Sequence, residues 1–166
     1  MYTFKATAIE NNTIQIETNT YWNCKAEGNF KLSSYDGSGN TIVSVLIPDD
    51  APTVEGTIYF SYGNGVCSIF ILDVYYTNNC YISTNPSYEL CNNERVLTLR
   101  YKQPNEAFMI DVFSFGGWVI GDANNVSYFV NENSLMVISP STGTGSLKII
   151  PSLCSSNFII VRFISN

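Results

Sequence analysis

The chain has 166 residues, a length that allows one medium-sized domain or two small ones. Hydrophobic residues make up 45% and charged residues only 13%, so the chain can bury a core, and Asn, Ser, Thr and Tyr must carry its surface. A net charge of −6, without any run of Lys or Arg, argues against binding of nucleic acid and against docking on an anionic membrane.

The first half of the chain predicts short strands, in which apolar and polar residues alternate, separated by Asn, Gly, Asp and Ser turns. Tyr2–Ala8 and Thr13–Glu17 are expected to form a hairpin around Asn11–Asn12. A short strand is expected at Phe30 and Leu32, followed by a turn over Tyr35–Asn40. The next expected strand, Thr41–Ile47, ends at the Pro48–Pro52 loop. Gly56–Tyr62 and Val66–Val74 are expected to form a hairpin around Gly63–Gly65. This pattern is typical of two antiparallel sheets packed face to face.

The second half predicts a looser copy of the same plan. Gly37 and Gly39 after Trp22 correspond to Gly143 and Gly145 after Trp118. The expected strands are Arg95–Lys102, Phe108–Phe115, Trp118–Ile120, Val126–Val130, Leu135–Ile138, Ser146–Ile150 and Phe158–Ile164. No stretch repeats its apolar residues with the period of a helix, so the expected fold class is all-β. We expect two tandem immunoglobulin-like sandwiches over residues 1–78 and 95–166, joined by a connecting segment over residues 79–94.

The segment around the expected junction is rich in tyrosine. Tyr75, Tyr76, Tyr81 and Tyr88 lie among Asn, Ser, Cys and Pro without a sustained period. Tyrosine supplies rigid amphipathic contact area, so these four residues are candidates for a protein interface; a packed linker is the equal alternative.

The five cysteines are odd in number and irregularly spaced, which is a poor disulfide framework. We expect five free thiols in a reducing compartment, with Cys80–Cys91 as the one pairing to consider. Because the chain has no His and no Cys-x-x-Cys, we expect no metal site and no cofactor.

The first half contains the segments Tyr21-Trp22, Leu32-Ser33-Ser34, Gly37-Ser-Gly39, the strand Ile42–Val45 and Gly56-Thr-Ile-Tyr-Phe. With these segments, roughly residues 4–74 resemble a BACON-type module, an immunoglobulin-like sandwich common in proteins of Bacteroidetes and their phages. Phe30 stands where such modules often carry a second Trp. The family name implies carbohydrate binding, although many members resemble spacer or surface domains.

The residues Met1–Glu10 lack the apolar stretch of a signal peptide, so we expect a protein made in the bacterial cytoplasm. A pair of such domains without an export signal resembles an auxiliary capsid protein of crAss-like phages. The expected function is therefore a structural, non-enzymatic virion protein that decorates the capsid, with the major capsid protein or other virion proteins as partners and weak adhesion to surface glycans. The alternative is an extracellular carbohydrate-binding module of a secreted Bacteroidetes protein.

Particular side chains allow competing interpretations. Trp22 and Trp118 suit sugar stacking, but a Trp in this position more often packs inside the sandwich. Asp36 with Asp49-Asp50 suits calcium, but two acids in a Pro-bounded loop are more often a solvated turn. A Ser or Cys nucleophile would lack a His base, and the sequence marks no carboxylate pair for a glycosidase, so an enzyme is the least favoured class.

Overall fold

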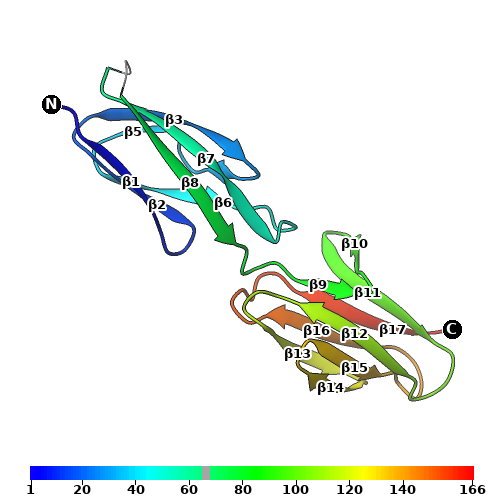
Figure 1. The fold of residues 1–166 in the computed structure, drawn as a ribbon. Helices are drawn as coiled ribbons and strands as arrows, with labels where there is room; N and C mark the ends of the chain where they lie inside the picture. The colour runs from blue at the N-terminus through cyan, green and yellow to red at the C-terminus, as the bar shows by residue number, and fades with distance from the viewer. Residues whose placement is uncertain (65–67) are drawn as a thin grey trace. The chain divides into compact units, whose positions relative to one another are not determined.

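The computed structural model describes residues 1–64 and 68–166. It divides into two compact units, Met1–Asn78 and Asn79–Asn166, each built from β-strands and turns (Figure 1). Each unit is a β-sandwich of two sheets, so the expected all-β fold class with two tandem sandwiches is confirmed. No helix in the described part of the chain is long and apolar enough to cross a membrane.

The first unit has two four-stranded sheets, in the orders β1-β2-β6-β4 and β5-β3-β7-β8 (Figure 1). The strands are β1 Phe4–Ile9, β2 Thr13–Thr18, β3 Tyr21–Gly28, β4 Lys31–Leu32, β5 Asp36–Ser38, β6 Thr41–Leu46, β7 Thr53–Tyr62 and β8 Ile69–Thr77. All pairs in both sheets are antiparallel.

Local sequence explains the opening hairpin. Asn11 and Asn12 both adopt positive φ, at 61° and 56°, which Asn tolerates better than most residues. The alternation in β2 then turns Ile14 and Ile16 inward, where both are fully buried. They meet Trp22, Ile58 and Phe60 of the other sheet in one hydrophobic core, which holds the two sheets together.

One expectation for this unit was wrong. Tyr35–Asn40 is not only a turn, because Asp36–Ser38 forms β5 and pairs with the start of β3. β3 itself continues to Gly28 and pairs along its length with β7. The turn of the β7–β8 hairpin falls partly on residues 65–67, outside the described residues.

Phe30 packs inside this unit rather than on its surface. Its side chain is 7% exposed and lies against the cross-strand pair Gly28–Gly56. A Cβ at Gly56 would stand 2.1 Å from the Glu27 carbonyl oxygen and 2.7 Å from the Phe30 ring. The two glycines therefore make the space that the ring fills.

The second unit has a five-stranded sheet, β10-β11-β17-β16-β13, and a four-stranded sheet, β14-β15-β12-β9 (Figure 1). Its strands are β9 Ser83–Asn85, β10 Glu89–Cys91, β11 Glu94–Tyr101, β12 Ala107–Phe113, β13 Trp118–Asn124, β14 Ser127–Asn131, β15 Ser134–Ile138, β16 Gly145–Pro151 and β17 Ile159–Ser165. The strands expected in this half of the chain are all present, with ends shifted by a few residues.

The second unit differs from the first in topology. Its first long strand, β11, pairs in parallel with its last strand, β17, whereas purely antiparallel sheets were expected. The core between the sheets contains Ile110, Val112, Leu135 and Val137 from one side and residues of β11, β16 and β17 from the other. The second unit is therefore a sandwich, but not a strand-for-strand copy of the first.

The segment expected to connect the domains contributes strands to the second unit. β9 pairs with β12, and β10 pairs with β11. Ile82, just before β9, is 1% exposed and belongs to the second core. The mixed Tyr, Asn and Ser sequence conceals these strands because they are only three residues long.

The expectation of five free thiols was wrong. Cys80 and Cys154 form a disulfide with an S–S distance of 2.02 Å, while Cys91 is free and exposed and Cys24 is free and half-buried. The bonded residues are 74 positions apart, so only the folded β9–β17 arrangement brings them together. Cys67 lies outside the described residues.

Candidate functional site

The four candidate tyrosines divide between the two units. Tyr75 and Tyr76 lie on β8 of the first unit, and Tyr81 and Tyr88 belong to the second. Tyr76 is half-buried, and its hydroxyl donates a hydrogen bond to the Thr13 carbonyl oxygen at 2.9 Å. Tyr76 is therefore a structural residue, whereas its neighbour Tyr75, on the opposite face of the strand, is 62% exposed.

The two tyrosines of the second unit also differ in role. The Tyr88 side chain packs against the second core, and the Arg95 guanidinium lies 6.0 Å from the centre of its ring. Tyr81 is half-buried and makes an edge contact with Phe113, with ring centres 6.3 Å apart. Tyr75 is thus the one exposed residue among the four candidates, and Tyr81 is a half-buried ring beside the exposed Phe113.

An apolar surface covers part of β7 and β8 in the first unit. It consists of Tyr59, Ile69, Ile71 and Tyr75, and we call it the β8 face. Tyr59 lies directly opposite Ile71 in the ladder, and the three β8 residues project to the same side because an even number of positions separates each from the others. Ile69, Ile71 and Tyr75 are each about 60% exposed. Large apolar side chains that gather on an outer sheet face are typical of a protein-contact surface.

Two carboxylates lie on the same side of the sheet as the β8 face, and Asp73 projects between Ile71 and Tyr75. Glu55 and Asp73 line one open depression together with Tyr75. The sequence could not indicate this pair, because it arises from the register Thr57–Asp73 and Glu55–Tyr75. Asp73 accepts a hydrogen bond from the Thr57 hydroxyl at 3.0 Å. A carboxylate so engaged on an open sheet face suits a structural role better than acid–base catalysis.

Both tryptophans contribute to cores. Trp22 is 3% exposed and packs edge-on to Phe60, with ring centres 5.9 Å apart. Gly37 of β5 lies against the indole, where a Cβ would come within 2.8 Å of the ring. Trp118 is half-buried against the second core. The packing interpretation of Trp22 is confirmed.

A cleft on the second unit combines aromatic and polar groups. Phe113, Asp111, Asn85 and Asn133 line it, and we call it the Phe113 cleft; its volume is about 330 Å³. Phe113 is 46% exposed and makes edge contacts with Phe115 and Tyr81, and of these three rings Phe113 is the one that lines the cleft. Exposed rings beside carboxylate and amide groups are suited to a sugar, which offers an apolar face and a rim of hydroxyls.

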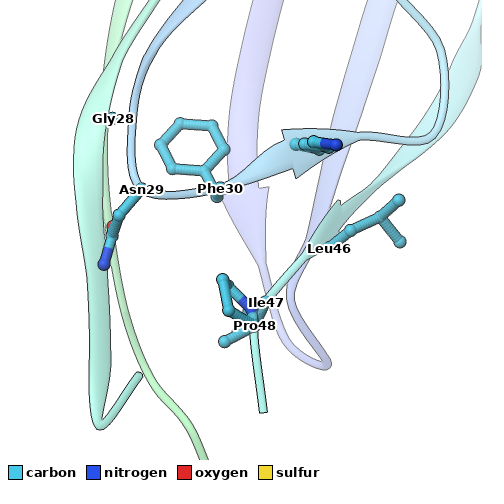
Figure 2. Close-up of a pocket in the computed structure, with 7 residues that line it drawn as sticks. Gly28, Asn29, Phe30, Leu46, Ile47 and Pro48 are labelled. Atoms are coloured by element: carbon cyan, nitrogen blue, oxygen red, sulfur yellow. The ribbon is translucent and has the colours of Figure 1, made fainter. Parts of the chain in front are cut away.

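An apolar opening beside Phe30 in the first unit is less suited to a ligand. Figure 2 shows the Phe30 ring above Ile47 and Pro48, with Leu46 to one side, around an open cavity of about 390 Å³. Asn29 at its rim is already engaged, since its side chain donates to the Thr53 carbonyl and accepts from the Glu55 amide. The opening therefore offers apolar contact but little polar specificity.

The proposed calcium ligands do not assemble. Within residues 1–64 and 68–166, no group of three or more ligating side chains lies close enough to hold a metal ion. Asp36 lies in β5, whereas Asp49 and Asp50 lie in the loop after β6.

Cys24, on β3, is expected to resist alkylation. Burial, and secondarily the negative charge of Asp36, raise the pKa of its thiol from 9.0 to about 11. At about pH 8 the reactive thiolate is then about a hundredfold scarcer than for an ordinary thiol. Iodoacetamide labelling followed by peptide mapping should modify the exposed Cys91 first and reach Cys24 only as the pH rises toward 11. Equal labelling of both residues at about pH 8 would contradict this assignment.

Comparison with known proteins gives little further information. No family model and no curated protein matches the chain. Among solved structures, it is similar to the endo-fucoidan hydrolase MfFcnA4 from glycoside hydrolase family 107 and to a variant of that enzyme, each with 11% sequence identity and a TM-score of 0.33. The match covers 99% of this chain and 24% of the hydrolase, so the chain spans about a quarter of that protein's length.

Proposed function

We propose that this chain is a non-enzymatic structural protein that decorates the surface of a phage capsid through protein–protein contacts. The observation that carries the proposal is the β8 face, where apolar side chains stand exposed on a rigid sheet. Contacts of this kind need no charge, which agrees with a chain in which only 13% of residues are charged. The resemblance of residues 4–74 to BACON-type modules supports the phage or Bacteroidetes setting.

The disulfide bears on where the protein works. Disulfides form and persist outside reducing cytoplasm. A Cys80–Cys154 bond therefore suits the exterior of a released particle or a cell surface better than the cell interior. We accordingly place the working form of the protein on the virion exterior, with an extracellular location as the alternative.

The test is rebinding of purified full-length chain to particles of the phage that encodes it, measured by co-sedimentation. Ile71→Lys places a charge in the centre of the β8 face and should weaken binding at least about tenfold. Ile42→Lys is the matched control, because Ile42 is 63% exposed and Ile71 is 59% exposed, on different sheets of the same unit. Equal effects of the two substitutions, or no binding by the unmodified chain, would refute the proposed surface.

A second candidate function, glycan binding, is favoured by the Phe113 cleft alone. The Phe113 ring would stack on a sugar face while Asp111 and Asn85 bind hydroxyls. Calorimetry against polysaccharide fragments should then show binding that Phe113→Ala abolishes and that Phe129→Ala, another exposed phenylalanine of the same unit, leaves intact. Tight glycan binding together with failure to associate with particles would make this candidate the function.

A further inference from the structure

The strand β14 is exposed on both of its faces. All five residues from Ser127 to Asn131 are exposed, including Tyr128 at 40%, Phe129 at 61% and Val130 at 53%. β14 lies at the edge of its sheet, with β15 on one side. A hydrophobic edge strand of this kind is a template for pairing with another strand.

Other edge strands in the described part of the chain carry features that hinder pairing. β4, β5, β9 and β10 are only two or three residues long, and Pro86 directly follows β9. β1 carries Lys5, β8 carries Asp73, and β13 has a bulge between Ile120 and Ala123. Shortness, charge, proline and bulges each block edge-to-edge association, and β14 has none of them.

The hydrogen-bond register shows which backbone groups of β14 are free to pair. Val112 donates to the Asn133 carbonyl, and Ser139 donates to the Glu106 carbonyl, so the odd-numbered residues of β15 bond to β12. The even-numbered residues, including Met136 opposite Phe129, must then bond to β14. By the same alternation, the N–H and C=O groups of Tyr128 and Val130 point away from β15, toward the open edge.

We propose that β14 pairs with β14 of a second copy of this chain, antiparallel and centred on Phe129, to form a twofold-symmetric dimer. In this register Tyr128 of one copy faces Val130 of the other, and these are the residues whose backbone groups point outward. Both hydrogen-bonded pairs of the new ladder are thereby completed. The same patch serves both subunits, as a twofold interface requires.

The side chains also favour a second copy over a foreign strand. Residues 127–131 carry no charge, so self-pairing brings no like charges together although the chain has a net charge of −6. For the same reason, β14 offers no opposite charge to a charged strand of another protein. Phe129, Met136 and Met109 lie in one cross-strand row on the outer face. Pairing at Phe129 would join this row to its symmetry mate across six strands.

The pairing needs neither a particle nor a glycan, so it is tested on the isolated full chain. All samples carry Cys91→Ser, because Cys91 is exposed and could cross-link copies. Sedimentation velocity between about 1 µM and about 500 µM, the range in which small interfaces associate, should show a dimer that grows with concentration. Hydrogen exchange should show the amides of Tyr128 and Val130 gaining protection over the same range.

Two variants and one control define the interface. Val130→Pro removes the backbone N–H that points to the open edge of β14, while the hydrogen bonds between β14 and β15 remain. Phe129→Lys places one cation from each copy at the symmetry axis. Each should weaken dimerisation at least about tenfold. Val119→Lys changes a residue that is 51% exposed on β13, an edge strand of the other sheet of the same unit, and should leave dimerisation unchanged.

A chain that stays monomeric over the whole concentration range would overturn the proposal. So would a dimer that Val130→Pro leaves intact, or a dimer in which the amides of Tyr128 and Val130 gain no protection from exchange. Protection of the two amides that appears only when the chain is bound to particles would also overturn self-pairing, and would identify a strand of another protein as the occupant.

Discussion

Replacing Cys80 or Cys154 with Ser is expected to lower the free energy of unfolding of the second unit by about 4 kcal/mol. The bond closes a loop of 74 residues, and the entropy that a cross-link removes from the unfolded chain grows with loop length. It fastens the start of the unit, beside the buried Ile82, to the loop between β16 and β17. The Asn157 side-chain amide, which donates to the Cys80 carbonyl, holds the same two segments together.

Urea unfolding of the full chain would measure this effect. Cys91→Ser is the matched control, since Cys91 is exposed and unbonded and should shift the transition by no more than about 0.5 kcal/mol. Reduction of the unmodified protein should reproduce the effect of Cys80→Ser. If Cys80→Ser unfolds at the same urea concentration as Cys91→Ser, the bond does not stabilise the unit.

Trp22→Ala is expected to destabilise the first unit by about 3–5 kcal/mol, because it leaves a cavity between the sheets. The indole packs against Phe60 and over Gly37, so little can move in to fill the space. Trp22→Phe should cost less, since the Trp22 Nε1 makes no hydrogen bond within the described residues and its loss leaves no polar group unpaired.

Tyr21→Ala is the matched control on the same strand. Tyr21 is 74% exposed on the opposite face of β3, so its removal should cost at most about 0.5 kcal/mol. Thermal or urea unfolding monitored by circular dichroism distinguishes the two variants. If Trp22→Ala and Tyr21→Ala are equally stable, Trp22 is not a core residue, and a surface role for it must be reconsidered.

The sequence predicts the parts of the fold that depend on local pattern. The Asn11-Asn12 turn, the alternating strand that contains Ile14 and Ile16, and the strands from β11 to β17 all follow from alternation and turn residues. The burial of Trp22 follows from the place of such a residue in a sandwich.

The remaining features depend on contacts between distant segments. No local signal pairs Cys80 with Cys154, and none makes β11 and β17 parallel. Tyr75 and Tyr76 are neighbours in sequence but project from opposite faces of β8, so Tyr76 is half-buried and Tyr75 is exposed. The exposure of the apolar residues of β8 and β14 could not be predicted either. The sequence of an alternating or apolar strand does not show which of its faces a second sheet will cover.

The most direct test of the proposed capsid role is a cryo-EM reconstruction of purified particles of the phage that encodes this chain, with quantitative mass spectrometry of the same preparation. We expect the chain at a fixed copy number per capsid, as a two-sandwich density on the exterior, with the β8 face in contact with another virion protein. Absence of the chain from purified particles would contradict the account and leave glycan binding at the Phe113 cleft as the function to pursue.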